Sequence, residues 1–593
     1  MKDFFKNVLA TVVGIFVFCM VSGLFFLVGL VGIIASSGGS KQRVSENSVL
    51  VVNLSGVIEE QAKENVLGPL TGDVYNNLGL DNILSAIDKA RENDKIKGIY
   101  LECGALNAGY ATLQEIRDAL LKFKKSGKWI VAYSDTYTQG CYYLASAANE
   151  VLMNPYGMLD WHGIVSQPIF LKDLYAKFGV KYQILKVGTF KSATEQFTED
   201  RMSDANRLQV TQYIEGLWSN ICQSVSASRK ISTDSLNAYA DRMVMFEPAQ
   251  NLKKYGLVDN LVYVDNVKNR IKKRLKISMS DRINTLSVED MKQVPAKKQN
   301  HQGDIIALYY AYGNIVQNSI SGNFSQNHEI ASTKVCQDLA DLMDDDDVKA
   351  VVLRINSGGG DAMASEFIWH QVKLLNQKKP VIVSMGDYAA SGGYYISSAA
   401  SWIVAQPNTL TGSIGIFAAI PDFSGLVTQK LGVKFDEVKT NRNSGFGNVF
   451  ARPLNSEEKA YLQGYINRGY DLFLSRVAEG RGMSKEEVDK IGQGRVWLGK
   501  AACDLALVDE LGGINVAVAA AAKYAKLKDY HVLSYPAPSN FLSNLFADMM
   551  RRGTLDEQLK TTLGDFYVPF MHLKNMNQRE VLQAQMPFVL NIN

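Results

Sequence analysis

The sequence predicts an α/β fold of two tandem domains that arose by internal duplication, behind one N-terminal transmembrane helix. Three observations lead to this prediction. The N-terminus carries a long uncharged stretch, the chain aligns with itself at an offset of 252 residues, and each repeat alternates apolar strands with amphipathic helices. A chain of 593 residues is also too long for a single hydrophobic core, so several domains are expected.

The uncharged stretch covers Val8–Ala35, which is 28 residues. A bilayer-spanning helix needs about 20 residues, whereas the apolar part of a cleavable signal has about 7–15. We therefore expect an uncleaved signal anchor, with a buried core helix as the alternative. Two lysines precede the stretch, and one lysine and one arginine follow it closely. This weak charge bias favours a cytoplasmic N-terminus with the bulk of the chain outside the cytoplasm.

The duplication is clearest where Val131–Ile164 aligns with Val383–Ile416 without a gap and with 11 of 34 residues identical. The alignment extends in both directions, so the repeated unit is a whole domain rather than a short solenoid repeat. The expected parts are the anchor and tether (1–47), a first repeat domain with Lys191 (48–277), a linker (278–303), a second repeat domain with Ser391 (304–535) and a tail (536–593).

The second repeat shows how each domain is wound. Val348–Ile355 is a continuous apolar run typical of a buried strand, and residues 364–377 have helical spacing of apolar side chains. Residues 380–385 form another apolar run, which a glycine-rich turn follows. This order predicts βαβ units and a mostly parallel sheet.

Composition argues against several classes of function. The net charge of +3 is too small to suggest a nucleic-acid partner. Six cysteines form no CxxC pair, and six histidines form no HExxH motif, so no metal site is expected. Nucleotide-binding glycine motifs are missing as well, and we expect no cofactor.

The duplication supplies an internal control, because a residue present in one repeat only is a candidate for function. Ser391 in "ASGGYY" aligns with Gln139 in "TQGCYY". The triple glycine of "NSGGGDA" (356–362) has no counterpart in the first repeat, and Lys191 aligns with Ser444. All three differences fall in the same region of the repeat.

These residue types suit nucleophilic catalysis. A serine hydroxyl needs a base, and a lysine can serve when burial keeps its amine neutral. Glycines at a strand-to-helix turn present backbone N–H groups that can stabilise an oxyanion. Taken singly, Ser391 also fits a packing residue, the glycines a tight turn and Lys191 a solvated surface charge.

Four motifs resemble the signal peptide peptidase A (protease IV) family in its long, duplicated bacterial form: "GTFKSATEQF", "RINSGGGDAMASE", "VIVSMGDYAASGGYYISSAA" and "QPNTLTGSIGI". The resemblance implies that Ser391 is the nucleophile and Lys191 the general base. It further implies that Ser413 hydrogen-bonds the lysine and that Gly360 and Gly392 supply the oxyanion-hole amides.

The same resemblance implies crotonase-like or Clp-protease-like domains and a Ser/Lys serine protease that hydrolyses cleaved signal peptides and other small or unfolded hydrophobic peptides. It implies a homo-oligomer, a homotetramer for the duplicated form, anchored in the bacterial inner membrane with its catalytic part in the periplasm. The first repeat has Trp161 in place of Ser413. Gly358 stands where the family usually has proline.

Two other functions stay open at this stage. A crotonase-like acyl-CoA enzyme would use paired backbone amides without a serine nucleophile, and a non-catalytic membrane scaffold would need neither residue. The sequence does not assign a role to the tail from residue 536 onward.

Overall fold

The computed structural model describes residues 6, 11, 13–23, 43–62, 78–295, 303–319, 328–536 and 583–585. Residues 13–23 of the predicted anchor are helical, and most of its other residues lie outside the described part. Among the described residues, no helix has both the length and the apolar character needed to cross a bilayer. The anchor therefore stays a prediction.

The first repeat forms a seven-stranded sheet in which all the strand pairs are parallel. The order is β2-β1-β3-β4-β5-β7, with β8 also pairing with β1. The strands are β1 (Ser48–Glu59), β2 (Leu78–Gly79), β3 (Ile96–Asn107), β4 (Trp129–Tyr137), β5 (Glu150–Leu159), β7 (Asn260–Leu261) and β8 (Thr285–Ser287).

The second repeat forms an eight-stranded sheet with the same winding. Its order is β18-β16-β14-β12-β9-β20, with β15 joining β14 to β19. The strands are β9 (Asp304–Tyr312), β12 (Val348–Ser357), β14 (Val381–Ala390), β15 (Trp402–Ala405), β16 (Leu410–Gly412), β18 (Val496–Leu498), β19 (Glu510–Leu511) and β20 (Tyr530–Tyr535). The strand pairs β9–β12–β14–β15 match β1–β3–β4–β5, which confirms the predicted duplication and the predicted α/β class.

A third sheet contains strands from both repeats and from the tail, in the order β11-β10-β13-β21-β17-β6. These strands are β6 (Lys181–Lys186), β10 (Asn314–Val316), β11 (Glu329–Ala331), β13 (Gly359–Asp361), β17 (Phe417–Asp422) and β21 (Gln583–Gln585). The antiparallel pair β6–β17 joins the first repeat to the second.

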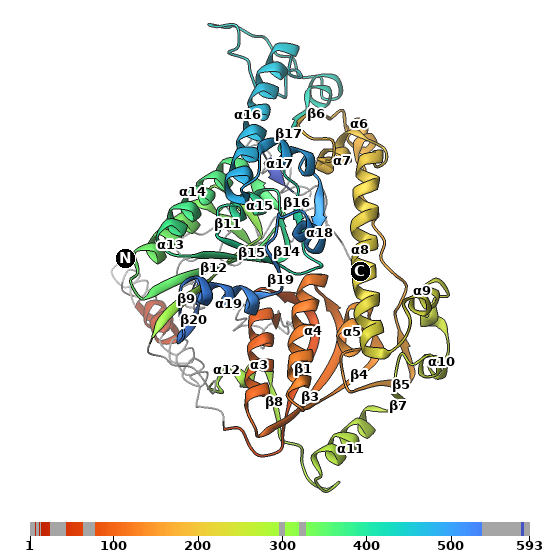
Figure 1. The fold of residues 1–593 in the computed structure, drawn as a ribbon. Helices are drawn as coiled ribbons and strands as arrows, with labels where there is room; N and C mark the ends of the chain where they lie inside the picture. The colour runs from red at the N-terminus through yellow and green to blue at the C-terminus, as the bar shows by residue number, and fades with distance from the viewer. Residues whose placement is uncertain are drawn as a thin grey trace.

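Helices cover the sheets of both repeats (Figure 1). In the first repeat they are α3 (Leu80–Glu92), α4 (Tyr110–Lys125), α5 (Gln139–Ala145), α6 (Lys172–Phe178), α7 (Glu195–Thr198), α8 (Asp204–Arg229), α9 (Thr233–Asp241), α10 (Ala249–Lys254), α11 (Val264–Leu275) and α12 (Val288–Lys292), with short η1 (Ser192–Thr194) and η2 (Val244–Phe246). In the second they are α13 (Ser332–Asp344), α14 (Ala362–Lys378), α15 (Gly392–Ser397), α16 (Ser456–Arg481), α17 (Lys485–Ile491), α18 (Gly499–Asp504), α19 (Ile514–Tyr524) and the π-helical η3 (Gly425–Lys430). Within the predicted linker, β8 pairs with β1 and α12 packs on α3.

Each repeat sends out an arm before its longest helix. We call residues 165–203 the first arm and residues 417–455 the second arm; their ends are equivalent at an offset of 252, and the segments around β6 and Lys191 at an offset of 253. The first arm carries β6 and reaches the second repeat, and α8 returns the chain along the side of the molecule (Figure 1). With 26 residues, α8 is about 39 Å long, which is enough to connect the two regions.

The hydrophobic cores of the two repeats interlock. Ala390, Leu410 and Val496 of the second repeat belong to the core of the first, and Leu185 of the first arm belongs to the core of the second. The two repeats therefore pack against each other through shared core residues. This packing can hold side chains from different repeats at defined distances, as packing within one domain does.

Candidate active site

Ser391 lies at the turn between β14 and α15. Its side chain is fully buried, and its backbone N–H donates to the carbonyl of Gly412 at 2.8 Å. The backbone has φ 56° and ψ −114°, a region that non-glycine residues rarely adopt. Such strain persists only where the surrounding structure imposes it, and it is concentrated at functional sites.

The equivalent turn of the first repeat is relaxed. There Thr138, with φ −71°, caps α5 and accepts a hydrogen bond from the Cys141 N–H, while Gln139 takes the place of Ser391. The buried Gln139 side chain donates to Tyr110 and to the Gly163 carbonyl. The strained turn is thus specific to the repeat that has the serine.

Lys191 lies on the first arm between β6 and η1, and the arm brings it to Ser391 from the other repeat. Its loop is held on two sides. The Phe190 N–H donates to the Gln493 carbonyl at 2.8 Å, and the buried Gln209 of α8 donates to the Phe190 carbonyl at 3.1 Å. At Gly494, with φ 78°, an added Cβ would lie 2.6 Å from the Lys191 Cβ, so only glycine allows this approach.

The Lys191 amine contacts two serines. Its Nζ lies 2.8 Å from Ser391 Oγ, 3.0 Å from Ser413 Oγ and 3.1 Å from the Ser413 carbonyl oxygen. All three residues are fully buried. The structure therefore brings together the three side chains that the resemblance had grouped, although they come from both repeats.

Burial lowers the pKa of Lys191 well below the ordinary lysine value. Desolvation penalises the charged amine, and the serine contacts do not supply the negative charge that would offset this penalty. The neutral amine has two N–H donors for the oxygens of Ser413 and a lone pair for the Ser391 hydroxyl. This geometry suits proton transfer from the serine to the lysine.

Gly360 and Gly392 lie on two elements that contact each other, β13 and α15. Gly392 is the first residue of α15, so its N–H has no acceptor within the helix. Gly360 pairs with Ile315 of β10, and an added Cβ would lie 2.1 Å from the Ile315 carbonyl oxygen. A side chain at this position is therefore excluded.

A buried polar network supports the strands that lead to the site, and the sequence analysis missed it. Arg354 donates to Glu60 of the first repeat at 2.9 Å, and Glu115 lies 2.7 Å from the same guanidinium. Glu60 also accepts from Asn356 at 2.8 Å, and Asn356 in turn accepts from the Tyr388 N–H, three residues before Ser391. An arginine inside an apolar strand was the available signal.

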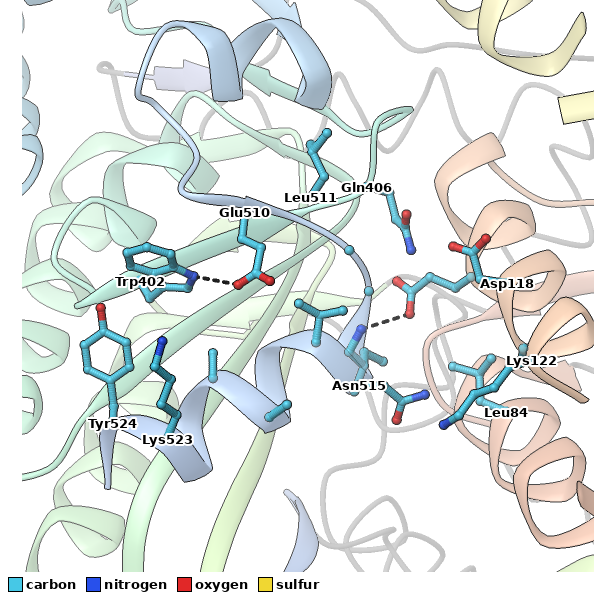
Figure 2. A pocket seen from close by; sticks show the side chains of 18 residues that line it. Leu84, Asp118, Lys122, Trp402, Gln406, Glu510, Leu511, Asn515, Lys523 and Tyr524 are labelled. Atoms are coloured by element: carbon cyan, nitrogen blue, oxygen red, sulfur yellow. Dashed lines mark hydrogen bonds between the residues drawn. The ribbon is translucent and has the colours of Figure 1, made fainter. Parts of the chain in front are cut away.

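A pocket of about 680 Å³ opens between the repeats, against α3, α4, β15, β19 and α19 (Figure 2). Asp118 and Gln406 face each other there, and burial raises the pKa of Asp118 to about 6. None of the five predicted site residues lines this pocket. Glu115 does line it, so the polar network reaches the pocket wall.

A serine at a strand-to-helix turn, with a basic side chain at hydrogen-bond distance, characterises the class of serine hydrolases. The model of peptidase family S49 matches residues 122–278 and 373–528, once in each repeat. The chain belongs to peptidase family S49 and is a serine peptidase. The Clp protease model matches residues 303–409, so the second repeat has a Clp-protease-like fold.

Three relatives resemble most of the chain. Protease 4 of Haemophilus influenzae is 35% identical over 83% of this chain and 82% of its own. Protease 4 of Salmonella typhi is 35% identical over 92% and 90%, respectively. The chloroplastic serine protease SPPA of Arabidopsis thaliana is 31% identical over 87% and 76%.

Proposed function

We propose that this serine peptidase hydrolyses peptides through an acyl-enzyme on Ser391, with Lys191 as its general base. The single observation that supports this most strongly is the buried contact of 2.8 Å between Lys191 Nζ and Ser391 Oγ. Neither a crotonase-like acyl-CoA enzyme nor a scaffold requires a strained serine beside a buried lysine. Both alternatives therefore leave the contact between Lys191 and Ser391 unexplained.

In the first step, the neutral amine takes the Ser391 proton while Oγ attacks the peptide carbonyl carbon. The resulting ammonium has three N–H groups, and Ser391 and the two oxygens of Ser413 lie at hydrogen-bond distance from it. The backbone N–H groups of Gly360 and Gly392 are proposed to stabilise the oxyanion. Each such donor contributes about 2.7–4 kcal/mol to lowering the barrier.

In the second step, the Lys191 ammonium gives its proton to the leaving amine as the C–N bond breaks. A water molecule then attacks the ester, and Lys191 accepts the water's proton. The tetrahedral intermediate collapses, the proton returns to Ser391 Oγ, and the peptide acid leaves. Each proton taken by the lysine is thereby returned.

The test combines covalent labelling with substitution. A fluorophosphonate should modify Ser391, identified by peptide mapping, and Ser391→Ala should abolish both labelling and peptide hydrolysis. Ser397→Ala is a matched control, because Ser397 is also a fully buried serine and lies at the other end of the helix that follows Ser391. Hydrolysis that persists in Ser391→Ala would refute the proposed nucleophile.

As substrates we propose small or unfolded hydrophobic peptides, including cleaved signal peptides. The N-terminal apolar stretch supports this, since an anchored enzyme meets such peptides at the membrane. The same stretch supports a location in the bacterial inner membrane with the catalytic part in the periplasm. The support for this orientation is the charge bias around the stretch.

We also propose that the chain forms a ring of copies, a homotetramer by the family resemblance. The β6–β17 pair has a second, unused equivalent, because residues 434–439 correspond to β6 and residues 165–170 to β17. Neither segment is a strand within the described part of the chain. Val438 is 99% exposed and Ile169 is 70% exposed.

Residues 434–439 of the second arm, which correspond to β6, are therefore exposed and without a strand partner in the described structure. In one copy the second arm projects away beside α16 (Figure 1). Pairing 434–439 of one copy with 165–170 of the next would repeat the contact that already joins the two repeats. Such a head-to-tail contact forms a closed ring when the rotation between copies allows closure.

A further inference from the structure

The tail places one short strand next to the candidate site. Strand β21 runs antiparallel to β13, with Gly360 opposite Ala584 and Gly359 opposite Gln585. On its other edge, Gln583 pairs with Phe417 of β17. The strand β21 thus lies between two strands that do not pair with each other in the described structure.

The two strands beside β21 are the ones that lead to the proposed catalytic groups. Strand β13 contains Gly360, and β17 begins four residues after Ser413. The far edge of β17 pairs with β6, and Lys191 follows β6 by five residues. Without β21, the sheet would separate into β11-β10-β13 and β17-β6, with a free edge on each side of a gap.

A gap between two free strand edges is a place for an extended peptide. Main-chain hydrogen bonds to the edges can hold such a peptide, largely independently of its side chains. A peptidase must hold its substrate in extended form beside the nucleophile, and β13 and β17 both lie next to residues of the candidate site. The gap that β21 occupies is therefore the expected substrate groove.

We propose that residues 583–585 are an intramolecular ligand of this groove, which a peptide substrate must displace. The inference rests on the proposed peptidase function. Because the segment belongs to the same chain, its local concentration does not fall on dilution. A tail that fills the groove nine-tenths of the time weakens the apparent affinity for another peptide about tenfold.

The test measures binding without turnover, in the Ser391→Ala background with an intact mass confirmed for each protein. The probe is a fluorescein-labelled peptide with the sequence of residues 579–589. The full chain is compared with a chain that ends at residue 582. We expect the shortened chain to bind the probe about tenfold more tightly by fluorescence anisotropy.

A point substitution separates occupancy from other effects of truncation. Ala584→Pro removes a backbone N–H from β21 and disfavours its strand, so it should also tighten probe binding. Val589→Pro, four residues beyond the strand, is the control and should bind the probe like the full chain. Any tightening in Ala584→Pro but not in Val589→Pro supports the proposal.

Two results overturn the inference, and they differ in what they say about the peptidase. Equal affinity in the full and shortened chains would show that the tail does not occupy the groove, while the proposed function stands. No binding by either chain would show that the gap does not accept peptides, and this would count against the proposed function as well.

Discussion

Lys191 shows how one buried side chain combines a cost in stability with a gain in reactivity. Removing an ammonium group from water is unfavourable, so burial lowers the pKa of Lys191 and favours the neutral amine, which is the form that can take a proton. Ser413 offers two oxygens to the amine without supplying a full negative charge. The pKa of the lysine therefore stays low.

Replacing the amine removes the base. Lys191→Met keeps much of the side chain's volume but cannot accept a proton, and we expect kcat to fall by about 10²–10⁴-fold. Steady-state peptide hydrolysis measures this. Lys177→Met changes an exposed lysine of the same arm and should leave kcat unchanged. A variant at position 191 with full activity would rule out the dyad.

The same substitution should make the protein more stable near neutral pH. In the wild type, folding forces Lys191 to lose a proton that the unfolded chain keeps, so the unfolded state binds more protons. The free energy of unfolding of the wild type should then rise with pH, by up to about 1.4 kcal/mol per unit, until the ordinary lysine pKa is reached. Lys191→Met lacks this contribution, so its advantage should shrink as pH rises. Urea unfolding at several pH values measures the difference, and an advantage that is constant with pH would contradict a neutral buried amine.

Ser413 acts on the lysine through two atoms, of which a substitution removes one. Ser413→Ala deletes the Oγ contact of 3.0 Å but leaves the carbonyl contact of 3.1 Å. We expect a loss of about 0.5–1.5 kcal/mol, or roughly 2- to 12-fold in kcat, together with a shift of the pH profile. A loss as large as that of Lys191→Met would mean that Ser413 does more than position the amine.

At the residue scale, the sequence grouped Lys191, Ser391 and Ser413, which lie together in the structure, but it did not predict how they are held. Comparing the repeats singled out Ser391 and Lys191 because each lacks an equivalent in the other repeat. The positive φ of Ser391 was not predictable, since a serine before two glycines does not require it and the turn at Gln139 is relaxed. In the folded chain the Ser391 N–H donates to the Gly412 carbonyl of β16, a tertiary contact that no local pattern contains.

At the scale of elements, the strands and helices of the second repeat follow their apolar patterns closely. The predicted strand over 348–355 is β12, and the predicted helix over 364–377 is α14. The arms were not predicted, because their short strands gain stability only from a partner in the other repeat. The pairing of β6 with β17 is a tertiary contact that no local pattern contains.

The network around Arg354 is a further link between the repeats, besides the β6–β17 pair and the interlocked cores. Arg354→Met would leave Glu60 and Glu115 buried without their countercharge, which costs about 3–5 kcal/mol when one partner of a buried pair is lost. We expect a lower urea midpoint and lower activity, since β12 and β14 lead to the site. Lys349→Met, on an exposed position of the same strand, is the control. An unchanged midpoint in Arg354→Met would show that the repeats do not depend on this network.

At the scale of the whole molecule, the duplication accounts for the candidate active site and for the proposed assembly. Strand β6 of the first arm pairs with β17 of the second arm within the chain, and this contact brings Lys191 to Ser391. The remaining equivalent segments, residues 165–170 and 434–439, are the ones proposed to pair between copies. The sequence alone showed the duplication. It could not show which of the two similar segments, "GVKYQILK" (179–186) or "GVKFDEVK" (432–439), would pair with a strand of the same chain.

The proposed contact between copies can be broken without touching the site. Val438→Asp places a charge in the segment equivalent to β6, and burying it in an interface without a partner is unfavourable. We expect the assembly to dissociate, as measured by light scattering. Val264→Asp changes an exposed valine outside both arms and should keep the mass of the wild type. A Val438→Asp protein of unchanged mass would contradict the proposed pairing.

The most direct test of the account is the rate at which a fluorophosphonate acylates Ser391 as a function of pH. The probe reports only the first step, so product release cannot hide the result. We predict that the rate rises with pH as Lys191 becomes neutral, reaches a plateau below the ordinary lysine pKa, and loses this dependence in Lys191→Met. A rate that is independent of pH in the wild type, or one that Lys191→Met leaves unchanged, would contradict the account.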